Sequence, residues 1–317
     1  MHTHPIRNTL VTIMLILCVW GTAGCGPVIP FPTPTPTLTP TRTPRPTPTH
    51  TRTPVPTSTP ILAPIPTSLM QDPSALSFTE ECRRVVDGLY ALKQDLGLPE
   101  NLMSENPVRQ ETDFDPNQYF KVLTHMGMKP SFQLDFLYFD DDLGGKPLVY
   151  ARPTGSAPFG SYTEFLQSFD EEMSGERSYG SLGHMYDYLG KIQIDGSPES
   201  YFEFVTLAFL GDQFYLRWHG LYNDLKILCD PGDMRHVNEG MKDFDLELPE
   251  YIQNGIGQID FTPKVLVEDE TVTVRIVAFT KWGGFFENIY VMERDNPVNL
   301  LDVQTNPLIE YDCGINF

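Results

Sequence analysis

Three groups of residues in this sequence combine side chains that could do chemistry. The first is Tyr215, Arg217 and His219, whose spacing of two places all three side chains on one face of a β-strand. On such a face the imidazole of His219 could act as a general base while the guanidinium of Arg217 binds a carboxylate. The alternative is a solvated or helix-covered sheet face with a hydrogen-bonded histidine, and the sequence alone favours this structural role.

The second group is the acidic run Asp140–Asp142, followed by glycine at 144 and 145. Clustered carboxylates suit Ca²⁺, which prefers about six to eight oxygen ligands. In an EF-hand loop that begins at Asp140 the twelfth position is Ala151, which cannot supply the required carboxylate. A polar hairpin turn explains the same residues, so we expect neither a metal site nor a cofactor.

The third group is an aromatic cluster at 281–286, where Trp282 and Phe285 flank a Gly-Gly pair. Exposed aromatic rings at a hairpin tip can stack on sugars or contact a partner protein, whereas buried ones pack on their own sheet. These two residues, with Tyr215, Arg217 and His219, are the candidate ligand-binding residues.

No familiar catalytic motif accompanies these groups. The sequence contains no G-x-S-x-G, H-E-x-x-H, C-x-x-C, P-loop or complete G-x-G-x-x-G pattern. We therefore expect a binding or structural protein rather than an enzyme. The alternative is a hydrolase with a non-standard active site around His219, because catalytic residues can be scattered along a chain.

Three cysteines remain after Cys18 and Cys25, namely Cys82, Cys229 and Cys313. Outside the cytoplasm a pair is expected to oxidise. The sequence favours Cys229–Cys313, since each follows a strand-like apolar run, and leaves Cys82 as a buried thiol on a helix face. All three pairings remain open at this stage.

The first third of the domain predicts three helices, each with a recognisable N-terminal cap. Ser77 and Ser161 are each followed three residues later by glutamate, which is the spacing of a capping box. Asp115 precedes a proline, as at the first turn of a helix. The expected helices span 77–96, 115–127 and 161–169.

Strands are predicted between and after these helices. The clearest hairpin joins 201–210 to 213–220 through Gly211-Asp212, and a second joins 132–139 to 147–152. The C-terminal strands are expected at 262–267, 271–280, 285–294, 300–304 and 308–313. A Gly283-Gly284 turn would place Ala278 opposite Ile289.

Helices first and strands afterwards predict an α+β fold, in which N-terminal helices pack on antiparallel β-sheet. The globular domain spans 72–317, and residues 251–317 could form a β-rich subdomain of their own. All 42 acidic residues lie in this domain with 18 of the 22 basic ones, so its net charge is −24. Such a charge excludes the basic surfaces that nucleic-acid binders need.

The N-terminal segment has the order of parts of an export signal. His2, His4 and Arg7 precede an apolar run at 10–20, which is too short for a permanent transmembrane helix of about 20 apolar residues. Gly21-Thr22-Ala23-Gly24 then leads directly to Cys25. This arrangement resembles the lipobox of bacterial lipoproteins, although Thr22 stands where that family usually has leucine.

The resemblance covers residues 1–25 and implies a signal peptide at 1–24 that is cleaved before a lipidated Cys25. It further implies a membrane lipid anchor at the cell surface, with palmitate among the acyl chains. An ordinary signal peptide cut near Ala23 would instead give a secreted protein.

A threonine-proline linker follows the cysteine within residues 25–71. Fourteen of the 29 prolines lie between Pro27 and Pro66, and this composition predicts a disordered, extended polyproline II segment. The sequence thus predicts a surface lipoprotein that contacts the membrane through its anchor, with a cell-wall or surface glycan or protein as partner.

Overall fold

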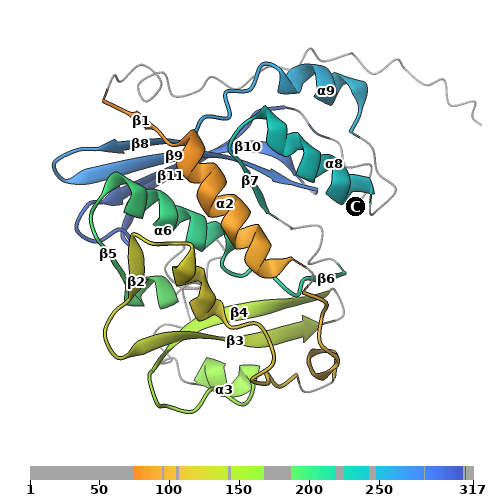
Figure 1. The fold of residues 1–317 in the computed structure, drawn as a ribbon, viewed down its shortest axis with the longest axis vertical. Helices are drawn as coiled ribbons and strands as arrows, with labels where there is room; N and C mark the ends of the chain where they lie inside the picture. Colours follow the sequence, from red (N-terminus) through yellow and green to blue (C-terminus); the bar gives the residue numbers. More distant parts are fainter. Residues whose placement is uncertain are drawn as a thin grey trace, which may run out of the picture. The chain divides into compact units, whose positions relative to one another are not determined.

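The computed structural model describes residues 74–94, 96–104, 107–141, 144–167, 187–218, 225–242, 248–281, 283–309 and 311. The described residues form helices and antiparallel sheets, so the fold is mixed α+β (Figure 1). The principal sheet has six strands in the order β1-β8-β9-β10-β11, with β7 also paired to β9. These strands are β1 (Leu76–Ser77), β7 (Lys226–Leu228), β8 (Lys264–Val267), β9 (Thr271–Thr280), β10 (Gly284–Glu293) and β11 (Leu300–Pro307).

Strand β9 lies inside this sheet and is buried on both faces. Its even-numbered residues Val272, Val274 and Ile276 belong to the main hydrophobic core. Its odd-numbered residues Val277 and Phe279 belong to a second core. A strand covered on both faces needs mostly apolar residues. The main exception in β9 is Arg275, whose fully buried side chain is ion-paired with Glu287 at 2.6 Å.

Helices cover the sheet through these two cores. Helix α2 (Thr79–Lys93) and helix α6 (Pro198–Leu210) contact each other, and α6 also contacts β8 and β9. Helices α8 (Met234–Lys242) and α9 (Glu250–Ile256) contribute to the second core.

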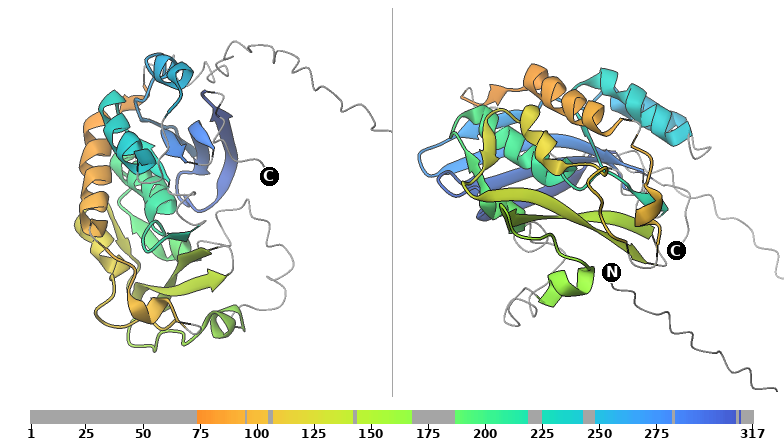
Figure 2. Two further views of the ribbon diagram at one scale, coloured as in Figure 1. Left: turned by 90° about the vertical axis from the view of Figure 1, so that its right-hand side faces the viewer. Right: turned by 60° about the horizontal axis from the view of Figure 1, so that its bottom comes forward.

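Two smaller sheets lie on the other side of α6 from the principal sheet (Figures 1 and 2). One consists of β3 (Phe132–Asp141), β4 (Gly144–Pro153) and β6 (Arg217–Trp218), and the other of β2 (Met126–Met128) and β5 (Ile192–Ile194). The remaining short elements are α3 (Tyr162–Gln167), η1 (Glu100–Leu102), η2 (Pro116–Lys121), η3 (Asp187–Lys191) and η4 (Pro231–Asp233).

The predicted hairpin at 201–220 is wrong, because residues 198–210 form helix α6. Ser197 caps this helix by accepting a hydrogen bond from the Ser200 amide, and Pro198 occupies its first turn. Ten of its 13 residues are buried. A helix that is apolar all round lacks the one-sided stripe of an amphipathic helix, and its aromatic and β-branched residues resemble those of a strand.

The predicted helices are confirmed in part. Helix α2 exists, but Ser77 lies in β1 and Phe78 occupies the N-cap without a side-chain hydrogen bond, so that capping box is wrong. Asp115 does cap η2, which ends at Lys121 and leaves Gly127 in β2 rather than at a helix end. The Ser161 hydroxyl accepts from the Glu164 amide at 3.1 Å, as predicted for α3.

The predicted hairpin at 132–152 is confirmed, since β3 and β4 pair from Phe132–Pro153 to Asp141–Gly144. The predicted register of β9 and β10 is wrong. Ala278 lies opposite Phe286 rather than Ile289, because the connection places Thr280 opposite Gly284 and is therefore a three-residue loop. Gly284 has φ of +78°, which favours glycine at this position.

The C-terminal strands do not form a core of their own. Residues of β8, β9 and β10 share the main hydrophobic core with α2 and α6. The predicted strand at 308–313 is not present at Leu308 and Ile309, which follow β11 in a bend, and its remaining residues fall mostly outside the described part of the chain.

A disulfide bond joins Cys82 of α2 to Cys229 at the end of β7, with the two Cα atoms 5.7 Å apart. The predicted Cys229–Cys313 pair is therefore wrong, and Cys313 lies outside the described residues. Both bonded cysteines are buried, at 0% and 1% exposure. The sequence placed Cys82 on the apolar face of a helix and predicted a free thiol there. That face carries the disulfide bond to Cys229.

We predict that Cys229→Ser lowers the free energy of unfolding by about 2–5 kcal/mol, because the bridge restrains a loop between residues 147 positions apart. Chemical denaturation measures this loss, and Cys313→Ser is the matched control with little expected effect. Peptide mapping without reduction should recover Cys82 linked to Cys229. A linked Cys229–Cys313 peptide would contradict the observed pairing.

Candidate functional site

Of the predicted Tyr215, Arg217 and His219 face, the structure describes only Tyr215 and Arg217. Tyr215 is buried and has φ of +52°, and its hydroxyl accepts a hydrogen bond from the Phe114 amide at 3.0 Å. Arg217 lies in β6 and forms an ion pair with Asp140. His219 lies outside the described residues. Tyr215 therefore stabilises the fold rather than lining a pocket.

The ion pair with Arg217 also bears on the acidic run at 140–142. Asp140 belongs to the β3–β4 hairpin, whose described strands end at Asp141 and Gly144. One oxygen of the Asp140 carboxylate is thus bound by a guanidinium. The predicted hairpin is confirmed by the pairing of its two strands, whereas Asp142 and Leu143 lie outside the described residues.

The predicted aromatic cluster at 281–286 is not an exposed surface at Phe285. Phe285 has 0% exposure and packs in the second core at 4.8 Å from the ring of Phe279. Trp282 lies outside the described residues. Phe285 therefore cannot stack on a sugar ring.

Sequence reasoning missed a cluster of charged residues between α2, α6 and β2, which we call the Glu203 cluster (Glu81, Arg84, His125 and Glu203). The Glu203 side chain is fully buried. Its carboxylate accepts hydrogen bonds from Arg84 at 2.8 Å, from the Thr124 amide at 3.0 Å and from the His125 amide at 2.8 Å. A carboxylate in the core is tolerated because both of its oxygens are satisfied.

The Glu203 cluster has ligand types that bind divalent metals. Ligand atoms of Glu81, His125 and Glu203 lie within 4.8 Å of one another. Arg84 lies between the two carboxylates and donates to Glu81 as well as to Glu203. Burial raises the pKa of Glu203, whereas the hydrogen bond from Arg84 lowers the pKa of Glu81. The guanidinium thus supplies the positive charge that an ion would bring.

We predict that Arg84→Ala costs about 2–4 kcal/mol of stability, because it leaves the buried carboxylate of Glu203 without its counter-charge. The matched control is Arg83→Ala, whose guanidinium is half-exposed and pairs with Asp230 at the surface, where an ion pair contributes little to stability. Urea unfolding of both variants gives the comparison. Equal losses would show that Glu203 does not depend on Arg84.

His125 also contacts a serine and an aspartate, as catalytic histidines do. Its Nδ1 lies 2.9 Å from Asp195 and 3.3 Å from the Ser197 hydroxyl. A Ser-His-Asp triad needs the serine and the aspartate on different ring nitrogens, so that the imidazole can take the serine proton. Here both contacts involve the same nitrogen. The arrangement caps the start of α6 and does not activate Ser197 as a nucleophile.

This contact shifts the pKa values of both partners. The hydrogen bond to Asp195 raises the pKa of His125. Burial raises the pKa of Asp195, but hydrogen bonds from Ser197 and His125 outweigh it and lower the value to about 2. Because the pKa of His125 is raised in the folded state, its contact with Asp195 stabilises the folded protein. This stabilisation is fully present below the unfolded-state pKa of about 6.5 and is lost as the pH rises through the folded-state pKa.

We predict that Asp195→Asn destabilises the protein more at pH 5.5 than at pH 8.5, because His125 is charged only at the lower pH. Urea unfolding at both pH values measures the difference, which we expect to be small for such an exposed pair. Asp269→Asn, at an exposed position in the β8–β9 connection, is the control. A loss that does not depend on pH would contradict the charged contact.

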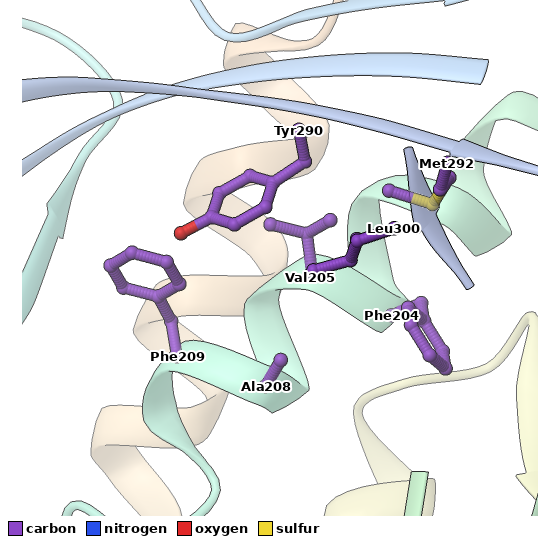
Figure 3. Close-up of a pocket in the computed structure, with 7 residues that line it drawn as sticks. All are labelled: Phe204, Val205, Ala208, Phe209, Tyr290, Met292 and Leu300. Carbon is purple, nitrogen blue, oxygen red and sulfur yellow. The ribbon is translucent and has the colours of Figure 1, made fainter. Parts of the chain in front are cut away.

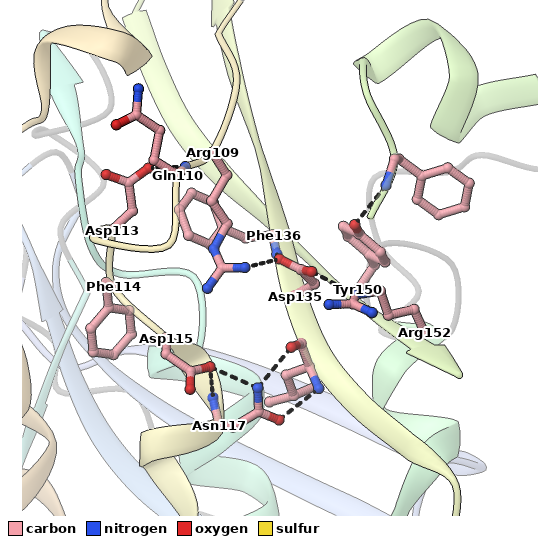
Figure 4. Close-up of polar contacts among 12 residues, drawn as sticks. Arg109, Gln110, Asp113, Phe114, Asp115, Asn117, Asp135, Phe136, Tyr150 and Arg152 are labelled. Carbon is pink, nitrogen blue, oxygen red and sulfur yellow. Dashed lines mark hydrogen bonds and ion pairs between the residues drawn. The ribbon is translucent and has the colours of Figure 1, made fainter. Parts of the chain in front are cut away.

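A second charged group surrounds the fully buried carboxylate of Asp135 in β3 (Figure 4). Arg109 donates to one oxygen at 2.8 Å and Arg152 to the other at 2.6 Å. The Arg109 guanidinium also lies over the ring of Phe136, 5.3 Å from its centroid. These contacts hold the segment before η2 against the β3–β4 hairpin, so the group stabilises the fold.

The described residues also contain a shallow apolar hollow between α6 and the sheet (Figure 3). Its walls come from α6 on one side and from β10 and β11 on the other. The ring of Tyr290 reaches from β10 toward Phe209 of α6, with the ring centroids 5.8 Å apart. The residues that line it are Phe204, Val205, Ala208, Phe209, Tyr290, Met292 and Leu300.

The accessible surface of the hollow is formed by apolar atoms alone. Tyr290 lines it but is itself buried, and burial raises the pKa of its hydroxyl. The free volume of the hollow is about 10 Å³, close to that of one water molecule, so the hollow is an apolar surface feature and not a substrate pocket.

Comparisons with known proteins give no relative: no family model, no curated protein and no solved structure matches this chain. Within the described part of the chain, every helix is too short or too polar to span a membrane.

Proposed function

We propose that this protein is a bacterial surface lipoprotein that displays an acidic α+β domain away from the membrane. The observation that carries the proposal is the position of Cys25, directly after an apolar segment and the small residues at 21–24. Acyl chains on this cysteine would supply the anchor, since each buried CH₂ contributes about 0.8 kcal/mol and stable attachment takes two chains or more.

In this proposal the segment at 25–71 is a disordered stalk. Its proline content prevents regular hydrogen-bonded structure, and about 40 residues at about 3.1 Å each could extend to roughly 120 Å. That length would carry the domain into or through a cell-wall layer. The domain would then contact a wall or surface glycan or another surface protein.

The disulfide bond supports an extracytoplasmic location. Cys82 and Cys229 form a buried bridge, and such bridges persist in oxidising compartments but are rare in the cytosol. This support is independent of the N-terminal segment, because the bridge lies wholly within the globular domain.

The domain fits a binding or structural role better than a catalytic one. The carboxylates of Glu203 and Asp135 are paired with arginines, and His125 lacks the geometry of a general base for Ser197. The alternative of a hydrolase around His219 has no support among the described residues, since the hairpin that would have positioned that histidine is replaced by α6.

We predict that Cys25→Ser abolishes incorporation of radiolabelled palmitate in bacteria that express the full chain, because serine lacks the thiol that forms the thioether to the diacylglyceryl group. Cys18→Ser is the matched control and should retain the label. Mass spectrometry of the native protein should find a diacylated cysteine at the N-terminus. An unmodified thiol there, or cleavage after Ala23, would overturn the proposal.

A further inference from the structure

Strand β11 is an edge of the principal sheet with an unusual amount of exposed apolar surface. No described strand pairs with its outer side. Leu301 and Val303 are 51% and 44% exposed. Proteins usually protect an edge strand with lysines, a bulge or a covering segment, because its backbone groups can pair with another chain. The strand is eight residues long and contains no lysine or arginine. Its pairing with β10 shifts at Leu301, so the regular part of the edge runs from Asp302 to Pro307.

The exposed edge adjoins the apolar hollow. Val303 lies directly opposite Tyr290 in the β10–β11 register, so the two side chains share one face of the sheet. Tyr290 lines the hollow together with residues of α6. A strand edge and a helix thus border a common apolar surface, which is the layout that lets a domain bind an extended peptide as an added strand.

We propose that β11 and the hollow bind an extended segment of a partner protein, which adds a strand to the sheet and is flanked by basic residues. Backbone hydrogen bonds along β11 would supply affinity. An apolar side chain of the segment would contact Val303 and cover the hollow.

Acidic residues near β11 favour a partner segment with basic residues. Asp302 lies on β11, and Glu293 and Asp295 lie at the β10–β11 connection. Arg294 stands among them, and its guanidinium donates to the backbone of Glu268. With a domain charge of −24, opposite charges on the segment favour association, whereas a second copy of this chain would bring the same charge.

This inference deepens the proposed binding role, but its test does not depend on the lipid anchor. The probe is a fluorescein-labelled peptide, Lys-Thr-Val-Thr-Val-Thr-Lys, together with versions that carry Ile, Leu or Phe in place of Val. Fluorescence anisotropy measures their binding to the purified full-length protein. One control peptide is N-methylated throughout its Val-Thr core, and a second has Glu in place of Lys.

We expect a lysine-flanked peptide to bind and both control peptides to bind at least about tenfold more weakly. The variant Val303→Lys should weaken binding by about tenfold, since it removes an apolar contact and repels the basic segment. Val108→Lys, at a position that is 54% exposed elsewhere on the domain, should leave binding within about twofold and provides the matched control. Thermal melts of both variants check that the fold is retained.

Other outcomes overturn the inference. Binding that survives N-methylation, or that Val303→Lys leaves unchanged, would exclude strand addition at β11. If no lysine-flanked peptide binds, the proposed site at β11 is ruled out, whereas the proposal of a lipid anchor is unaffected. If sedimentation detects a dimer that Val303→Lys dissociates, the edge of β11 binds a second copy of the chain instead of a partner protein.

Discussion

Because helix α6 is buried on nearly every side, it is stable only where neighbours cover it. The principal sheet covers one side, α2 another, and β2 and β5 contact it from a third direction. The same burial encloses Glu203, which would be costly without partners. The arrangement of α2 and of the segment at 122–125 is accordingly tied to one carboxylate, through Arg84 and two backbone amides.

This central helix is also where prediction from the sequence failed. Elements with one buried face were recognised correctly, as for α2, with its apolar residues at helical spacing, and for the β3–β4 hairpin. Helix α6 has no exposed polar face, since Glu203 and Thr206 are buried with its apolar residues, and its aromatic and β-branched content favoured a strand. The signal that could have identified it is Ser197-Pro198 with Glu199, which has the form of a helix start. The β9–β10 register failed for a different reason, since it depends on whether Gly283 and Gly284 form a two-residue turn or belong to a three-residue loop.

The charged clusters could not be predicted from residue spacing. Arg84 and Glu203 are 119 positions apart, and His125 and Asp195 are 70 positions apart. Local patterns such as alternation or an acidic run carry no information about such pairs, which meet only once α2 and β2 pack on α6. The same holds for the disulfide, because the sequence offered three cysteines but no measure of distance. The apolar hollow lies between α6 and β10, and the sequence predicted the strand β10 but not the helix α6.

The bridge between Cys82 and Cys229 has a consequence for a chain that a protease has cut. The two cysteines are 147 positions apart, so most of the exposed loops of the described domain lie between them in sequence. A single cut of the backbone anywhere between the two cysteines leaves the two fragments covalently joined. Their separation therefore takes a reductant as well as a cut.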